Sequence, residues 1–290
     1  MANSITLAKN YIANLDEVYK MASTTTDLNS PAEIVRQGAN AKEILVPKMS
    51  MTGLRNYNRG TGYQSGDVTL GWETLTFNYD RGLKFQVDTM DNEESINLAF
   101  GQLGAEFMRT QVAPEADAFT YATLAGTSGI QDAASGGVSY TDGEDVLDAL
   151  VAAMTAMDEA EVPTTERYLK ITPTLYRLAQ NVKSYINAGI LDAFAGITPV
   201  PQSRFYTQVT LLDTSAGSYQ KTATTGADLN FMIIHKPAII KYDKHIASDI
   251  ITPAANQDAD AYMMKYRKYG IVDVYDNKVK GIYISHKAKG

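Results

Sequence analysis

The sequence contains no cysteine, which excludes disulfide bonds, thiolate catalysis and thiolate metal sites. No stretch approaches the ~20 consecutive apolar residues that a membrane-spanning helix needs. Basic residues are not in excess either: 26 Lys and Arg stand against 33 Asp and Glu, which gives a formal net charge of −7. A dedicated nucleic-acid binder usually shows a basic balance or a basic stripe, so we expect no strong binding of nucleic acid.

Specific catalytic motifs are also missing. The sequence contains no Walker loop, zincin pair, nucleophile elbow or EF-hand loop. Gly60, Gly62 and Gly66 come near a dinucleotide fingerprint, but the spacing is one residue too long and a strand is expected where that fingerprint needs a helix. We therefore predict no catalytic residues, no cofactor and no enzyme activity.

Two sets of titratable residues leave a chemical role open. A general-base role stays open for one of the three histidines, although none has a carboxylate at metal-ligand spacing: His235, His245 and His286. Four acidic residues could bind a divalent cation, or they could complement the dipole at the start of a helix: Asp88, Asp91, Glu93 and Glu94. The helix-start interpretation is favoured, and no metal site is predicted.

Helical spacing dominates the middle of the chain. Asp91 is a candidate N-cap, and apolar residues then recur at helical spacing to about Leu124, with Pro114 expected to kink or split the helix. A Gly- and Ser-rich linker follows. Residues 141–182 then alternate helix, strand and helix, with Thr141 or Asp142 as caps and Val146 to Met157 supplying an apolar stripe that includes Val151. Strands are expected near residues 231–234, 238–242 and 262–275, with 279–285 closing a hairpin.

The N-terminal third predicts an arm followed by a long hairpin. Residues 1–42 carry short helix signals around Tyr11 to Met21 and after Ser30, separated by a polar loop. Residues 43–88 read as two strands around a glycine-rich tip. The alternation of the returning strand changes phase between Trp72 and Leu75, as a bulge or bend would produce. We interpret this region as one long, kinked hairpin.

The hairpin raises the question of what covers its apolar side chains, because two strands alone are marginally stable in water. One alternative is that it lies flat on its own domain. The other is that it projects and is covered by another copy of the chain. The 18 tyrosines, many of them in extended segments, mildly favour an interface. The side chains expected to touch another copy are Leu54, Tyr57, Arg59, Tyr63 and Trp72.

The order of elements, and several local segments, resemble the major capsid proteins of tailed bacteriophages with the Hong Kong 97-type fold. The local resemblance is to a capsid family of phages from Gram-positive gut bacteria. It covers most of the chain and is weakest over residues 183–228. The segments that carry it are IVRQGANA (34–41), VPKMSMTGL (46–54), TGYQSGDVTLGWET (61–74), DRGLKFQVDTMDNEE (80–94), FMRTQVAPEADAF (107–119) and VYDNKVKGIYIS (274–285).

This resemblance implies an α+β, Hong Kong 97-like capsid fold. It implies an N-terminal arm (1–42), an extended hairpin loop reaching over a neighbouring subunit (43–88) and a peripheral domain with a spine helix (89–140). An axial domain (141–234) and closing strands shared by both domains (235–290) would follow. Some family members cross-link a loop lysine to a neighbour. Here Lys48 and Lys84 lie near the hairpin base, so no cross-link is predicted.

The implied function is a structural shell subunit. It would self-assemble as hexamers and pentamers into an icosahedral shell that encloses double-stranded DNA without sequence-specific binding. A separate scaffold protein and a portal are the expected partners, with no membrane. The protein would reside in the virion after assembly in the host bacterial cytoplasm. An encapsulin-like nanocompartment subunit, which shares the fold, and an unrecognised α/β enzyme remain the alternatives.

Overall fold

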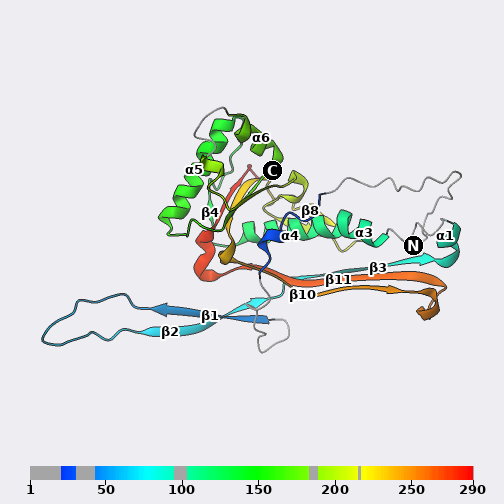
Figure 1. Ribbon diagram of the computed structural model, residues 1–290, viewed down its shortest axis with the longest axis horizontal. Coiled ribbons are helices and arrows are strands. Elements are labelled where there is room, and N and C mark those ends of the chain that lie inside the picture. The colour runs from blue at the N-terminus through cyan, green and yellow to red at the C-terminus, as the bar shows by residue number, and fades with distance from the viewer. Residues whose placement is uncertain (1–20, 31–42, 95–102, 183–188, 215–216, 290) are drawn as a thin grey trace.

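The computed structural model describes residues 21–30, 43–94, 103–182, 189–214 and 217–289. These residues form an elongated α+β molecule. A wedge-shaped body carries a long three-stranded sheet that runs to one side and a two-stranded hairpin that projects to the other (Figure 1). Within the described ranges, no helix is both long and apolar enough to cross a bilayer.

The body is built on a five-stranded sheet with the strand order β4-β12-β9-β5-β6. The central strand β9 (Leu229–His235) is buried along its whole length, and its side chains alternate between two apolar clusters. One cluster is shared with α5 and α6, and the other with α4. The other elements are β4 (Gln131–Asp132), β5 (Arg167–Ile171), β6 (Gly196–Pro199), β12 (Ile282–His286), α4 (Ala113–Gly126), α5 (Gly143–Glu159) and α6 (Pro173–Asn181).

Local sequence signals account well for α5, β5 and α6. Asp142 caps α5 by accepting a hydrogen bond from the Glu144 backbone N–H at 3.3 Å. The predicted apolar stripe is largely buried against the sheet, with one exception: Val151 is 40% exposed, so its assignment to the buried face was wrong. Pro173 opens α6 in the first helical turn, where its missing N–H costs nothing.

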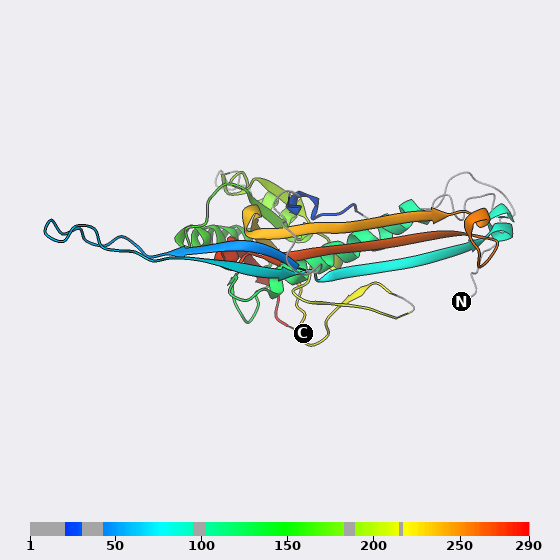
Figure 2. The ribbon, with the colours of Figure 1, turned by 90° about the horizontal axis from the view of Figure 1, so that it is seen from below.

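The second sheet has the order β10-β11-β3, from β10 (Ile239–Ile251), β11 (Ala261–Val274) and β3 (Tyr79–Asp88). Its strands lie side by side along the molecule in the view from below (Figure 2). A helical rod covers one face, and aromatic contacts join the two: the rings of Phe85 and Phe107 are 4.8 Å apart, and those of Tyr79 and Phe119 are 5.0 Å apart.

The predicted long helix is only partly as expected. Residues 103–126 form a continuous helical rod of α3 (Leu103–Phe107), the π-helical turn η3 (Met108–Val112) and α4. Pro114 is the second residue of α4, two positions after the end of η3, so the irregularity falls beside the proline that was expected to interrupt the helix. The predicted N-cap was wrong: α1 (Thr89–Glu94) begins before Asp91, and Asp88 accepts the Met90 N–H at 2.9 Å. Residues 95–102 lie outside the described residues.

The predicted hairpin over 43–88 is shorter than expected. It consists of β1 (Glu43–Met51) and β2 (Val68–Thr76), paired from Glu43 opposite Thr76 to Met51 opposite Val68. Residues 79–88 form β3, which pairs with β11 in the second sheet. The change of phase therefore marks a crossing from one sheet to another, between Thr76 and Tyr79, instead of a bulge within one strand.

The prediction that residues 279–285 close a hairpin with the preceding strand was also wrong. The strand β12 pairs with β9 and β4 of the five-stranded sheet, whereas β11 pairs with β10 and β3. The short helix η7 carries the chain from one sheet to the other. A separate two-stranded sheet is formed by β7 and β8. The remaining elements are η4 (Gln202–Arg204), β7 (Val209–Leu211), β8 (Tyr219–Lys221), η5 (Lys236–Ala238), η6 (Pro253–Ala255) and η7 (Asp276–Gly281).

The described part of the predicted arm, residues 21–30, belongs to the core. Leu28, in the short helix η1 (Thr26–Leu28), is fully buried among side chains of α4 and the five-stranded sheet. Ser30 exchanges hydrogen bonds with the Lys241 backbone. The helices predicted around Tyr11 to Met21 and after Ser30 fall on residues 1–20 and 31–42, which lie outside the described residues.

Candidate functional site

The side chains predicted to contact another copy lie on the projecting hairpin, in two groups. Leu54, Tyr57, Arg59 and Tyr63 occupy the tip, whereas Trp72 lies on the shaft, opposite Pro47. All five are exposed: the exposed fraction is 60% for Tyr57, 93% for Tyr63 and 58% for Trp72, and Leu54 is fully exposed. The structure brings Tyr57 and Tyr63 together, with ring centroids 5.0 Å apart.

The shaft of the hairpin has one apolar face. Residues directly opposite each other in an antiparallel pair point to the same side, and alternate pairs share a face. Three such pairs therefore form a continuous apolar strip: Pro47 with Trp72, Met49 with Leu70, and Met51 with Val68. Five of these six side chains are between 53% and 69% exposed: Met49, Met51, Val68, Leu70 and Trp72. The sequence alternation indicated Val68, Leu70 and Trp72, but it did not show that Met49 and Met51 of the other strand lie on the same face.

The root of the hairpin is buried on its own body. Ile44 and Leu75 lie opposite each other at the base and pack against Ile240 of β10 and Ile271 of β11. The alternative in which the hairpin lies on its own domain therefore holds only for its root. Beyond the root, the shaft and tip extend away from the body (Figure 1).

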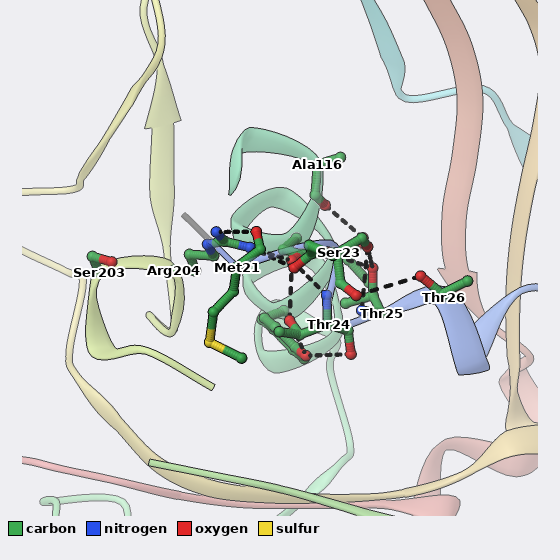
Figure 3. Close-up of polar contacts among 12 residues, drawn as sticks. Met21, Ser23, Thr24, Thr25, Thr26, Ala116, Ser203 and Arg204 are labelled. Atoms are coloured by element: carbon green, nitrogen blue, oxygen red, sulfur yellow. Dashed lines mark hydrogen bonds and ion pairs between the residues drawn. The ribbon is translucent and has the colours of Figure 1, made fainter. Parts of the chain in front are cut away.

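A second group of polar side chains, which sequence reasoning missed, anchors the segment Met21–Ser30. Its centre is Asp117 of α4, a fully buried carboxylate. It accepts hydrogen bonds from the Ser23 hydroxyl at 2.7 Å, the Thr24 backbone N–H at 2.8 Å and the Thr25 hydroxyl at 2.7 Å (Figure 3). Arg204 of η4 completes the arrangement with an ion pair at 3.0 Å.

Two buried lysines hold the same segment from the sheets. Lys170 of β5 donates to the Asp27 carboxylate at 2.7 Å and to the Thr24 carbonyl at 2.8 Å. Burial lowers the pKa of Lys170, and the bond to Asp27 opposes that shift. Lys241 of β10 donates to the Thr25 carbonyl at 2.9 Å and to its hydroxyl at 2.6 Å, and burial lowers its pKa to about 8. The cluster thus joins residues 21–30 to both sheets and to α4.

This polar cluster is a structural anchor. Its charged groups are satisfied by one another and by the segment they hold, so they are not presented to a substrate. The only signals for it were the run of hydroxyl residues at 23–26 and an aspartate within a helical pattern. The partners of Asp117 come from positions more than 80 residues away, which no local pattern reports.

The titratable residues considered from the sequence do not converge. His235 and His286 lie at opposite ends of the β9–β12 pairing, and His245 lies in the other sheet. Burial lowers the pKa of His235, whereas His286 hydrogen-bonds Asp132 at 3.2 Å. Within the described ranges, no three His, Asp or Glu side chains are arranged to hold a metal ion.

Comparison with known proteins shows the fold. No family model matches the chain, and no curated protein matches it. Among solved structures, the capsid of cyanophage P-SCSP1u is 15% identical, with a TM-score of 0.63 over 98% of this chain and 93% of that one. The mature capsid of bacteriophage PhiM1 is 12% identical, with a TM-score of 0.66 over 97% and 91%. A virus-like particle from Pyrococcus furiosus is 11% identical, with a TM-score of 0.50 over 90% and 95%. The chain therefore shares the fold of phage capsid structures over nearly its whole length.

Proposed function

We propose that this protein is the major capsid protein of a tailed bacteriophage, which self-assembles into an icosahedral shell around double-stranded DNA. One observation carries the proposal: in a chain with a capsid fold, an apolar strip lies uncovered on a hairpin that projects from the body. The fold shared with phage capsids supplies the context.

The strip favours a partner that is another copy of the chain. Covering its five half-exposed apolar side chains stabilises an interface by roughly 1 kcal/mol each. That sum is modest for one pair of copies, since association also costs translational and rotational freedom. In a closed shell every copy both gives and receives such a contact, so many modest contacts add up. Because each contact is modest, a wrongly placed copy can still dissociate.

The finer assignments follow from this proposal and from the sequence resemblance. Residues 103–126 would serve as the spine helix of the peripheral domain, and the five-stranded sheet with α5 and α6 as the axial domain around the axes of hexamers and pentamers. The partners would be further copies, a separate scaffold protein and a portal. The protein would reside in the virion after assembly in the bacterial cytoplasm. The net charge of −7 suits a shell that encloses DNA without binding it tightly.

An encapsulin-like nanocompartment is the second candidate, because the virus-like particle structure shares the fold. The contents of natural particles separate the two candidates. Double-stranded DNA inside the particles supports the capsid, whereas cargo proteins without DNA support the nanocompartment.

The adjacent residues Leu70 and Thr69 give a matched test of the apolar strip, because they are both exposed but point to opposite faces of β2. We expect Leu70→Asp to abolish the shells that electron microscopy detects for the unmodified protein, with its unfolding temperature unchanged. Thr69→Asp should still assemble. Equal assembly of the two variants would contradict the proposal, as would an unmodified protein that stays monomeric at high concentration, alone and with its scaffold.

A further inference from the structure

Residues 21–30, the strap, connect the two sheets through consecutive backbone carbonyls. Lys170 of β5 donates to the Thr24 carbonyl at 2.8 Å, and Lys241 of β10 donates to the Thr25 carbonyl at 2.9 Å. The Cα atoms of these two threonines are ~3.8 Å apart, as in any trans-linked pair. One lysine belongs to the five-stranded sheet and the other to the three-stranded sheet, so the strap fixes the two sheets relative to each other at this point.

Directional polar bonds supply most of the hold on the strap. Asp117 of α4 accepts bonds from three successive strap residues, and Arg204 of η4 donates to the carbonyls of the two residues before them (Figure 3). Leu28 is the only fully buried apolar side chain among residues 21–30. Hydrogen bonds weaken steeply when their geometry changes, whereas apolar contacts are non-directional. The strap therefore fits one relative position of the two sheets and resists others.

Two short turns carry the chain directly between the sheets, and they lie against each other. The turn η5 links β9 to β10, and η7 links β11 to β12. The Tyr275 N–H donates to the Ala238 carbonyl at 3.0 Å, and a Cβ atom on Gly281 would come within 2.7 Å of the Ala238 Cβ. The helix α4 packs on both sheets as well. Adjacent element ends of this kind form a hinge line, about which packed layers can turn by small slides.

The charges that bond the strap are unbalanced without it. Among the described residues, three cations and one carboxylate hold the strap: Lys170, Arg204, Lys241 and Asp117. The strap itself contributes the Asp27 carboxylate, 2.7 Å from Lys170, and a carbonyl for each of the three cations. A buried charge that loses its partner is strongly destabilising. Loss of the strap therefore favours separation of the sheets, because separation lets water reach these charges.

We propose that the strap is a conformational lock: docked, it holds the two sheets at one angle, and released, it lets them turn about η5 and η7. Thr25 is the centre of the lock, because its hydroxyl bonds both Asp117 at 2.7 Å and Lys241 at 2.6 Å. The lock acts within each chain, so it does not rest on the proposed shell function. Its strength sets how far a folded chain changes shape without unfolding.

The first test measures how often the junction between the sheets opens. The sequence has no cysteine, so an introduced thiol is the only one that a thiol reagent can label. Val272→Cys places this thiol in the apolar cluster shared by both sheets and Leu28. Ala153→Cys places it in the cluster between α5 and the five-stranded sheet. Labelling requires these buried sites to open, and its urea dependence distinguishes local opening from global unfolding.

Thr25→Val and Thr26→Val are the matched changes, because Thr25 is buried against the lysines and Thr26 is exposed beside it. The Val272→Cys thiol should react roughly tenfold faster in the Thr25→Val background than in the Thr26→Val background, with a weak dependence on urea. The Ala153→Cys thiol should keep the steep urea dependence of global unfolding. Equal Val272→Cys rates in the two backgrounds, or the same urea dependence at both sites, would overturn the lock.

The second test weakens the strap near its other end. Asp27→Asn keeps the shape of a side chain that is 31% exposed, and it removes the negative charge beside Lys170. It should speed the reaction of the Val272→Cys thiol several-fold, whereas Asp249→Asn, on the exposed part of β10, should not. This pair carries the test if Thr25→Val does not fold. Equal rates for Asp27→Asn and Asp249→Asn would contradict the proposal.

The third test measures the turning of the sheets. Spin labels at Glu159→Cys on α5 and Lys84→Cys on β3, both exposed positions, should report one distance in labelled subunits diluted with unlabelled protein. Combining Thr25→Val with Asp27→Asn should add a second, different distance. A single unchanged distance, for strap changes that accelerate the Val272→Cys reaction, would show that the strap detaches without the sheets turning, and it would overturn the hinge.

Discussion

Lys241 is a single buried side chain that ties a distant segment of the chain to the second sheet. It donates hydrogen bonds from β10 to Thr25, although the loss of water on burial, and then the nearby Lys268, lower its pKa. No local pattern distinguishes this lysine from the exposed lysines of the same strands. Like Asp117, it is identified only when a distant segment is brought to it, and residue-scale chemistry was therefore the part of this protein least predictable from sequence.

The lowered pKa of Lys241 predicts a pH dependence of stability. Its folded-state pKa of about 8 lies below the ordinary value of 10.5, so between these values the unfolded chain holds a proton that the folded chain has released. The free energy of unfolding should therefore rise with pH above about 8. Above about pH 10 the buried tyrosines Tyr121 and Tyr266, whose pKa values are raised by burial, act in the opposite direction.

Urea unfolding between pH 7.5 and 9.5 checks this prediction. Lys241→Met should show a smaller rise in the free energy of unfolding than the unmodified protein, with a residual rise from Lys170, whose pKa is lowered in the same direction. Lys265→Met, on the exposed side of β11, should keep the full rise. Identical pH profiles for the two variants would contradict the assignment of this rise in the free energy of unfolding to Lys241.

At the scale of elements, sequence periodicity succeeded where an element buries one face against its neighbours in the chain. The α5, β5 and α6 unit was predicted because each element carries its own cap, proline or apolar stripe. It failed where pairing is non-local. The strands β3 and β12 were both detected, but each was assigned to the neighbouring strand in sequence, whereas each pairs with strands far along the chain. Alternation shows which face of a strand is apolar, but it does not show which other strand it pairs with.

A close approach of two helices gives a prediction at this scale. A Cβ atom on Gly143, the first residue of α5, would collide with the Leu178 carbonyl oxygen of α6 and with Val182. Gly143→Ala should therefore lower the free energy of unfolding by about 1–3 kcal/mol. Gly126→Ala, at the end of α4 with open space around it, should change it by less than about 0.5 kcal/mol. Urea unfolding measures both, and a harmless Gly143→Ala would show that the helices can separate.

For the whole molecule, the sequence resemblance predicted an α+β capsid fold, and the solved phage capsid structures share the fold of this chain. The alternation alone predicted a hairpin but left its projection open, because the same alternation fits a strand pair lying on its own domain; only the resemblance implied an extended loop. The part of the hairpin that is covered depends on where its root packs. The root packs on Ile240 and Ile271, which lie almost 200 residues further along the sequence.

The charge of the whole molecule gives a prediction about nucleic acid. With a net charge of −7, isolated subunits should bind double-stranded DNA no more tightly than ~100 μM at about 150 mM salt in a mobility-shift assay. Tight binding that weakens steeply with salt would instead indicate a dedicated DNA-binding face, and it would count against a shell that merely encloses DNA.

The small root of the hairpin has a geometric consequence. Among the described residues, four buried side chains form the centre of the cluster that mounts the hairpin on the body, and four partly buried ones pack around it: Ile44, Leu75, Ile240 and Ile271, with Val46, Phe77, Tyr242 and Tyr275. Because the shaft and tip extend beyond this root, a swing of a few degrees at the root would displace the far end by many times more than it would disturb the base. In the proposed shell, identical copies would meet at more than one angle, and a swing at this root would let one sequence satisfy those angles without rebuilding its interior.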